Sequence, residues 1–434
     1  MNNTTVGTES EQPSLEPGLL TAYIALGIMA VVPIYFGSFA SLKFKKRIKT
    51  GSKVTLAPID DDHDDEAEFF SLEDAKMFPL FGSATLLSLY LLFTYFDKAY
   101  VNYVLTAYFA ILGVGALVKA GLMIARKATG WDIKGEYKIE MFKGQKEILS
   151  YHFGIFHLVL LALSIVVGAY YAMTKQWIVS NMYGEALATS AVQLLNLDSF
   201  ATGMALLAGL FFYDIFWVFG TDVMVTVAKS FDAPIKVVFP KDIFQLLASH
   251  TLHGVRGKTE FTMLGLGDIV IPGIFVALCL RFDLHNYEQT PAGKRIPKTT
   301  AFPKPYFTAC FVAYALGLVA TVTVMHSLKA AQPALLYLSP ACILSVLATA
   351  VVRGELKQIW AYAPDTGKKK NTEPDAVSDS ADNHDDANAA SKRAVKSTAS
   401  RTKSDTDASS VADDDEEADE PTSGRRITRS RKAK

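Results

Sequence analysis

Cysteine is scarce in this sequence: Cys279, Cys310 and Cys342 are the only three among 434 residues, and each lies inside an apolar run. Thiols in such places usually serve as small buried hydrophobic side chains, so neither a disulfide framework nor a cysteine-based metal site is indicated. The sequence also lacks the G-x-S-x-G pattern of serine hydrolases and the H-E-x-x-H pattern of zinc proteases. Two common routes to hydrolytic chemistry therefore have no support.

Basic residues are missing before the first apolar run, which begins near residue 19, whereas Glu9, Glu11 and Glu16 precede it. A cleaved secretory signal needs a positively charged start and a shorter apolar core. We therefore expect this run to remain in the protein as its first membrane span.

Charged residues are rare over most of the middle of the chain. Hydrophobic residues make up 50% of the sequence, and they gather in runs of about 20 residues, the length that a membrane-spanning helix needs. The sequence thus predicts an all-α polytopic membrane protein with about nine transmembrane helices. Asn181, Glu185 and Gln193 make the fifth span the most polar, and we expect it to face protein more than lipid. The predicted spans are 19–42, 77–96, 99–124, 153–174, 177–196, 200–220, 262–281, 305–327 and 331–352.

Composition divides the chain into an N-terminal segment at 1–18, a membrane domain at 19–355 and a tail at 356–434. The tail is rich in Ser, Ala, Asp and Lys and cannot bury enough apolar surface to fold, so we expect it to be disordered. Its last four residues, Arg-Lys-Ala-Lys, fit a di-basic retrieval signal and equally well a solvated charged end. The acidic run at 60–66 is interpreted as a solvated loop rather than a metal site, because its histidine, His63, stands alone.

The distribution of positive charge predicts the orientation in the membrane. Lys and Arg cluster in the segments 43–49, 125–150 and 281–304. The positive-inside rule places these segments in the cytoplasm, which leaves the N-terminus outside and the tail inside. The basic loop at 221–261 disagrees with this orientation. Asn2 and Asn3 agree with it, because each begins an N-glycosylation pattern.

Two aspartates stand alone within apolar segments. Asp214 follows Tyr213 in one segment, and Asp268 follows Gly265-Leu-Gly267 in the next. A carboxylate at bilayer depth costs about 2.5–3.5 kcal/mol, so such a residue is by default a candidate functional residue. Two of them on separate spans suggest a pair that meets inside a helix bundle.

A pair of facing carboxyl groups has a defined chemistry. Repulsion prevents both from ionising near neutral pH, so the pair holds one shared proton. In aspartic proteases the ionised member takes a proton from water while the protonated member polarises the peptide carbonyl. This reaction needs no metal ion and no cofactor. Gly265 and Gly267 allow a helix or a substrate backbone to approach closely. For Tyr213, aromatic packing is favoured over a hydroxyl that acts near the water or substrate.

A third feature opens the last span, where Gln332-Pro333-Ala334-Leu335 occurs. Proline leaves a backbone carbonyl unpaired and the small Ala334 permits close contact, so this segment could line the site or receive an extended substrate. On physical grounds alone, an ordinary helix that starts at a proline is favoured.

These three motifs, in this order on three apolar segments, resemble the signature of intramembrane aspartyl proteases, the presenilin and signal peptide peptidase families. Any one motif alone is weak, but the ordered trio inside membrane spans is highly specific. The stretches 216–230 and 233–240 are similar to the signal peptide peptidase family rather than to presenilin. The resemblance covers roughly 75–355, and Glu185 departs from the family pattern in the fifth span.

The resemblance implies a presenilin-like bundle of nine spans in the endoplasmic reticulum membrane, with a lumenal N-terminus and a cytoplasmic C-terminus. It implies that Asp214 and Asp268 are catalytic and that the other motif residues position the substrate. The implied substrates are membrane-embedded signal peptides and type II-oriented transmembrane segments, cleaved within the lipid bilayer. It leaves room for a homo-oligomer or an endoplasmic reticulum degradation complex, and we expect no nucleic-acid partner. The implied positioning residues are Tyr213, Gly265, Gly267, Gln332, Pro333, Ala334 and Leu335.

Two other functions use the same aspartates differently. A transporter or ion channel would relay protons or bind cations through them and would release no peptide product. A catalytically idle adaptor that holds substrates for a degradation complex would tolerate Asp→Ala at either position. The ordered motifs favour the protease.

Overall fold

The structure is a computed structural model. It describes residues 17–364 except 43–44, 51–52, 59–67, 130–136, 144–145, 232–233, 242, 244–259, 292, 294–300 and 329–331. The predictions for Asn2, Asn3, the acidic run at 60–66 and the tail beyond residue 364 lie outside the described residues.

Nine helices of 18 residues or more account for most of the described chain. Seven of the nine are long and apolar enough to cross a membrane; the other two are α5 and α9. The prediction of an all-α polytopic membrane protein with about nine spans is confirmed. The nine are α1 Pro17–Ala40, α2 Leu72–Tyr95, α3 Lys98–Thr129, α4 Ile155–Thr174, α5 Trp177–Leu194, α6 Phe200–Phe219, α9 Leu266–Gln289, α11 Pro305–Leu328 and α12 Leu335–Arg353.

Short elements that the sequence analysis did not predict connect the long helices. Four pairs of strands form two-stranded sheets, β1 with β2, β4 with β5 and β7 with β8 antiparallel, and β3 with β6 parallel. Their bounds are β1 Lys45–Thr50, β2 Lys53–Pro58, β3 Glu68–Phe70, β4 Tyr137–Lys143, β5 Lys146–Phe153, β6 Leu195–Leu197, β7 Lys236–Pro240 and β8 Phe261–Gly265, and the short helices are α7 Val223–Ser230 and α13 Leu356–Ala361.

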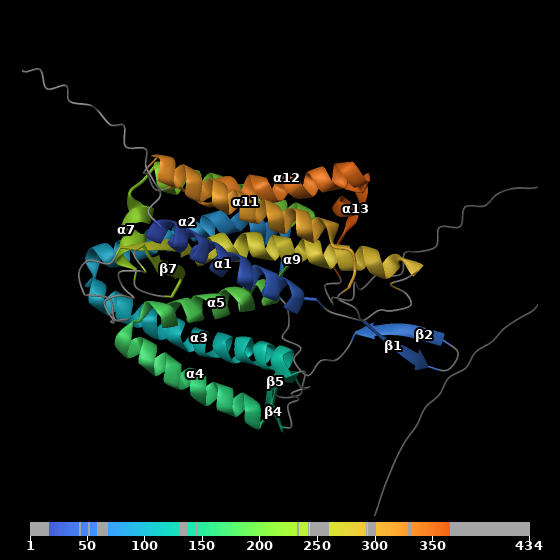
Figure 1. The fold of residues 1–434 in the computed structure, drawn as a ribbon. Helices are drawn as coiled ribbons and strands as arrows, with labels where there is room; N and C mark the ends of the chain where they lie inside the picture. The colour runs from blue at the N-terminus through green and yellow to red at the C-terminus, as the bar shows by residue number, and fades with distance from the viewer. Residues whose placement is uncertain are drawn as a thin grey trace, which may run out of the picture. The chain divides into compact units, whose positions relative to one another are not determined.

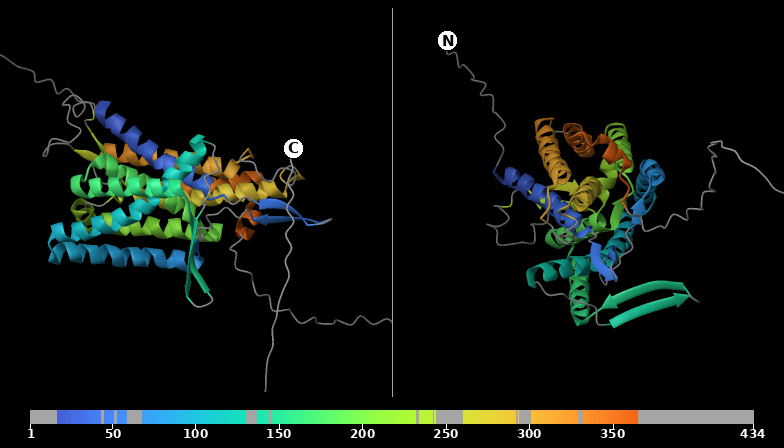
Figure 2. Two further views of the ribbon diagram at one scale, coloured as in Figure 1. Left: turned by 90° about the horizontal axis from the view of Figure 1, so that it is seen from below. Right: turned by 90° about the vertical axis from the view of Figure 1, so that its right-hand side faces the viewer.

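Helix α9 lies at the centre of the bundle. It contacts α1, α5, α6, α11 and α12, whereas α3 and α4 lie beyond α5, and α2 lies beside α6 (Figure 1). The long helices run in roughly a common direction in the further views (Figure 2). The segment from Ile274 to Leu280 is buried on every face, as a helix that is apolar all round should be.

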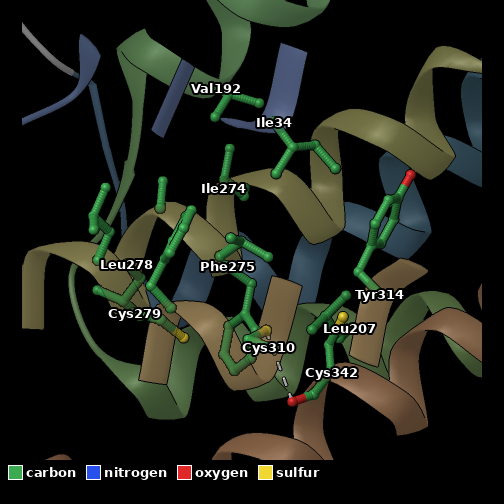
Figure 3. Packing of buried hydrophobic residues seen from close by; sticks show 14 of the residues in the cluster. Ile34, Val192, Leu207, Ile274, Phe275, Leu278, Cys279, Cys310, Tyr314 and Cys342 are labelled. Atoms are coloured by element: carbon green, nitrogen blue, oxygen red, sulfur yellow. Dashed lines mark hydrogen bonds between the residues drawn. The ribbon is translucent and has the colours of Figure 1, made fainter. Parts of the chain in front are cut away.

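Small residues let the central helices approach closely. A Cβ added at Gly203 of α6 would lie 2.5 Å from Cδ2 of Phe275, and one added at Gly273 of α9 would lie 2.8 Å from Cγ2 of Val192. Figure 3 shows Val192 together with Ile34 on one side of α9. Close backbone approach of this kind is how helices associate inside a membrane, where no hydrophobic effect drives them together.

The three cysteines belong to this core. All are free and buried, as predicted. Cys310 of α11 and Cys342 of α12 lie together, with the Cys310 thiol 4.0 Å from the Cys342 carbonyl oxygen (Figure 3).

The fifth span, α5, faces protein as expected, because it packs against α1, α3 and α9 and eight of its 18 residues are buried. Its polar Asn181 is paired: Nδ2 donates to the Val238 carbonyl oxygen at 2.7 Å, and Oδ1 accepts the Val238 N–H at 2.9 Å. A side-chain amide thus acts as a strand partner for β7.

A polar cluster joins α9, α11 and α12 at the opposite end of the bundle from β7 and β8. Asp283 of α9 accepts the backbone N–H groups of Tyr306 (3.4 Å) and Phe307 (2.9 Å) at the start of α11. The Tyr306 hydroxyl donates to Glu355 at 2.8 Å, just beyond α12. The fold continues past residue 355, because Ile359 of α13 is fully buried.

Candidate functional site

Asp214 lies on the buried stripe of α6. Phe200, Gly203, Leu207 and Leu210 precede it on that stripe at intervals of three or four residues, the spacing of one helical face. Asp214 itself is only 4% exposed. The sequence therefore points this carboxyl into the bundle, while neighbouring phenylalanines such as Phe212 and Phe216 face outward.

Asp268 lies in the first turn of α9, immediately after strand β8. Its position follows from the hairpin, because β8 pairs with β7 from Lys236↔Gly265 to Pro240↔Phe261. We predicted the seventh span as helical from residue 262; the structure instead has a strand to Gly265. The apolar Phe-Thr-Met-Leu of β8 joins the apolar start of α9 without a break, so hydrophobicity alone could not separate them.

The two carboxyl groups come together. The carboxyl of Asp214 lies within electrostatic range of that of Asp268, although 53 residues, which include the β7–β8 hairpin, separate the two in the sequence. Asp268 is partly exposed, whereas Asp214 is buried. The pair therefore has one member in contact with the surface and one inside the bundle.

The third motif meets the same site. The backbone N–H of Leu335, the first residue of α12, faces the carboxyl of Asp214 as a hydrogen-bond donor. Helix α12 was predicted from residue 331 but begins at Leu335, because Pro333 has no N–H and Leu336 N–H turns back to the Pro333 carbonyl at 3.3 Å. The first N–H groups of a helix lack internal partners, so one of them is free to hold the aspartate.

Of the remaining motif residues, the two glycines differ in their surroundings. A Cβ at Gly265 would lie 3.4 Å from Oδ2 of Asp268, whereas nothing lies within 4 Å of one added at the exposed Gly267. The space next to Asp268 is therefore unoccupied on the side of Gly267 and occupied by the Asp268 carboxyl on the side of Gly265.

The ring of Tyr213 lies against Gly82 of α2, where an added Cβ would be 3.5 Å from Cε2 of Tyr213, and its phenol is within electrostatic range of Asp214. Its ring centroid is 6.3 Å from that of Trp217. Pro333, Ala334 and Leu335 are buried and Gln332 is partly buried.

Tyr314 of α11 is a site residue that the sequence analysis missed. Its hydroxyl donates to the backbone carbonyl of Asp268 at 3.3 Å. In a regular helix that carbonyl would accept the N–H of residue 272, which here is Pro272 and has none. The proline thus indicated an unpaired carbonyl at Asp268, but nothing in the sequence pointed to Tyr314 as its donor.

The far end of the β7–β8 hairpin is closed by an ion pair. Lys241 Nζ lies 2.6 Å from Glu260 Oε2, and the Lys241 N–H donates to the Glu260 carbonyl at 2.9 Å. The hydrogen bond from Lys241 holds the pKa of Glu260 below its ordinary value. Asn181 contacts this hairpin on one side and the ion pair closes its end, and β8 of the hairpin leads directly into the turn of α9 that holds Asp268.

The arrangement can activate water and polarise a carbonyl with two carboxyl groups alone. Within the described parts of the chain, no group of three or more His, Cys, Asp or Glu side chains is arranged to hold a metal ion.

Comparison with known proteins decides the family. The profile of the signal peptide peptidase family matches residues 62–366, well over half of the chain. The chain belongs to the signal peptide peptidase family. It is 40% identical to the signal peptide peptidase of Mus musculus over 373 residues, which cover 85% of this chain and 90% of that protein. The Homo sapiens protein is also 40% identical over 373 residues, covering 85% and 89%.

A fungal relative is named differently. A probable intramembrane protease of Schizosaccharomyces pombe is 36% identical over 302 residues, which cover 70% of this chain and 86% of that protein. Membership of the signal peptide peptidase family makes this multi-pass membrane protein an intramembrane protease.

Proposed function

We propose that this protease is an aspartic endopeptidase whose catalytic pair is Asp214 and Asp268. The observation that carries the proposal is that the carboxyl groups of Asp214 on α6 and Asp268 on α9 lie within electrostatic range of each other, with the N–H of Leu335 at the start of α12 facing Asp214. Two carboxyls that share a site hold one proton between them. The ionised one takes a proton from water, the resulting nucleophile attacks the peptide carbonyl, and the protonated one donates to the carbonyl oxygen.

Substrate binding uses the edge of β8. In the described residues, β7 covers one edge of this strand and no strand pairs with the other. A transmembrane helix protects its own peptide bonds by internal hydrogen bonds, so the segment to be cut must first unwind. The unwound segment adds to the free edge of β8, which ends three residues before Asp268. We expect residues that weaken helices near the cleavage position of substrates.

The substrates proposed are membrane-embedded signal peptides and type II-oriented transmembrane segments, in the endoplasmic reticulum membrane. Two relatives carry the name signal peptide peptidase, which supports this choice. The proposed protease domain is 19–355, against which α13 packs through the buried Ile359. It acts alone, as a homo-oligomer or within a degradation complex.

The proposed orientation has the N-terminus in the lumen, glycosylated at Asn2 or Asn3. Lys127 at the end of α3 lies 4.3 Å from the ring centroid of Phe36, and Lys304 before α11 lies 5.6 Å from that of Phe39. Both aromatic residues are near the C-terminal end of α1. Basic residues at the end of α3 and just before α11 thus gather beside the C-terminal end of α1, which supports a cytoplasmic location for that side.

The test is cleavage of a synthetic signal-peptide helix by the purified full-length protein, with products identified by mass spectrometry. Asp214→Asn and Asp268→Asn should each lower the cleavage rate on the order of 10²–10⁴-fold. Asp222→Asn is the matched control, because Asp222 lies just beyond α6 at the start of α7 and should leave the rate unchanged. Cleavage that survives either change at the pair would refute the proposal. Binding of substrate without cleavage by the unaltered protein would favour the adaptor, and proton or cation flux without a peptide product would favour the transporter.

A further inference from the structure

Glu185 of α5 is a third carboxyl inside the bundle that the catalytic pair does not use. Its Oε1 atom is buried and has no hydrogen-bond partner among the described protein atoms. A buried polar atom without a partner costs about 1–3 kcal/mol, and an ionisable one within a membrane span costs more. An apolar side chain at this position would give a more stable bundle, so the glutamate needs another reason.

The surroundings of Glu185 connect it to Asp268. A Cβ added at the preceding Gly184 would lie 3.5 Å from Cδ2 of Leu266, the first residue of α9. The phenol of Tyr314 lies within electrostatic range of both the Glu185 and Asp268 carboxyls, and its hydroxyl contacts the Asp268 backbone at 3.3 Å. The part of α5 that carries Glu185 therefore packs beside the first turn of α9, which holds Asp268. It is also only partly buried as a residue, so one part of its side chain reaches the surface.

We propose that Glu185 binds water next to Tyr314 and Asp268, and so forms a hydrated branch of the active site between α5, α9 and α11. Water inside proteins is held where two to four polar groups converge. The candidate partners of this water are the Glu185 carboxyl, the Tyr314 hydroxyl, which lies within electrostatic range of both carboxyls, and the Asp268 carboxyl. Hydrolysis within an apolar bundle consumes water at every turnover, so a polar group beside the catalytic pair supplies the reactant. Glu185 is a positioning residue, because it acts through water, and the inference rests on the proposed aspartic mechanism.

The test compares two replacements of Glu185 in the purified full-length protein. Glu185→Gln keeps a side chain that donates and accepts hydrogen bonds, and should hold kcat close to that of the unaltered protein. Glu185→Leu removes the polar group and should lower kcat about tenfold, the effect of one lost hydrogen bond, with KM unchanged. The Tm of Glu185→Leu should equal or exceed that of the unaltered protein, because an apolar side chain replaces a buried polar one.

Tyr183 offers a matched control on the same helix. Its hydroxyl is also buried without a hydrogen-bond partner among the described atoms, but its ring packs against Tyr171 of α4, with centroids 5.5 Å apart. Tyr183→Phe should leave kcat unchanged. A small hydrophilic thiol reagent should also label Glu185→Cys and not Tyr183→Cys, because the native cysteines are buried.

The outcomes separate the inference from the proposed function. An unchanged kcat in Glu185→Leu overturns the hydrated branch. The hydrated branch is also overturned if Glu185→Gln loses as much kcat and as much Tm as Glu185→Leu does. Failure of the reagent to label Glu185→Cys overturns it as well. Retained cleavage by Asp268→Asn in the same assay would overturn the aspartic mechanism itself, whatever the Glu185 variants do.

Discussion

The hydroxyl of Tyr314 takes the place of a backbone donor for Asp268. It donates to the Asp268 carbonyl at 3.3 Å, where Pro272 has removed the N–H that would close the first turn of α9. This hydrogen bond stabilises the first turn of α9, which would otherwise be free to open. The turn contains Asp268, which we propose to be catalytic.

This relationship predicts a non-additive pair of substitutions. Tyr314→Phe should lower the free energy of unfolding by about 1–3 kcal/mol, because it leaves the Asp268 carbonyl without its hydrogen-bond donor. Pro272→Ala restores an N–H at position 272, so Tyr314→Phe should cost much less in that background. Thermal unfolding of the four proteins in detergent gives the coupling energy. An equal cost in both backgrounds would show that the tyrosine does not replace the missing N–H.

The N–H of Leu335 predicts a second effect, on catalysis. Leu335→Pro removes the donor to Asp214 and also disfavours the αR conformation of Ala334 (φ −67°, ψ −37°), whereas Leu335→Ala removes the same packing and keeps the N–H. A hydrogen bond to a charged group contributes about 1.5–3 kcal/mol, so kcat of the proline variant should be roughly 10- to 100-fold below that of the alanine variant. Equal kcat values for the two variants would remove Leu335 from the mechanism.

The sequence predicted the long helices well because membrane spans carry strong, long signals. Residues 200–220 and 305–327 were predicted as spans, and the structure has helices at Phe200–Phe219 and Pro305–Leu328. The strands were missed. Hairpin β7–β8 is short, and the partner of its β7 strand on α5 is a side chain, Asn181, which no periodicity reveals.

The site was predictable where a residue is anomalous in its context. A lone Asp in an apolar run and a proline in a helix are visible in a sequence, and they mark Asp214, Asp268 and Pro272. Tyr314 was not predictable, because it is one aromatic among many in an apolar span and its role depends on how α11 packs on α9. The proximity of Glu185 to that tyrosine is likewise a product of packing.

Substitution of Gly267 can distinguish an effect on substrate contact, measured by kcat/KM, from an effect on stability, measured by Tm. Gly267→Ala places a methyl group where nothing lies within 4 Å, and alanine favours a helix by up to about 1 kcal/mol over glycine. Tm should therefore stay or rise. If an extended substrate passes over this face, kcat/KM should fall about tenfold through lost contact of one or two groups.

Two controls accompany this substitution. Gly27→Ala makes the same change on α1, also with nothing within 4 Å, so Tm should again stay or rise while kcat/KM is unchanged. Gly203→Ala forces a Cβ to within 2.5 Å of Phe275, and should cost about 1–3 kcal/mol of stability. If Gly267→Ala behaves like Gly27→Ala in cleavage assays, the substrate does not approach Asp268 from this side.

We expect Glu355 to make a pH-dependent contribution to stability at the end of the bundle opposite β7 and β8. Partial burial raises its pKa, but hydrogen bonds from Arg353 and Tyr306 lower it more, so the pKa of Glu355 lies below its ordinary value. A carboxyl with a depressed pKa in the folded state stabilises the protein above the unfolded pKa, about 4.3 for glutamate, and loses this effect as pH falls through the folded pKa. Glu355→Gln should therefore be less stable than the unaltered protein by about 1 kcal/mol at pH 7.

The decisive feature is how this difference in stability changes with pH. Unfolding of both proteins in detergent should show a constant gap from pH 7 to about pH 5, which closes at more acid pH because the native glutamate becomes protonated and resembles the glutamine. Tyr306→Phe removes the 2.8 Å hydrogen bond to Glu355 and leaves the ion pair between Arg353 and Glu355 at 3.1 Å. The difference in stability between Tyr306→Phe and the unaltered protein should therefore be smaller, and it should disappear over the same acid pH range. A gap that persists unchanged into acid would mean that Glu355 stabilises the junction of α11 and α12 by packing rather than by charge.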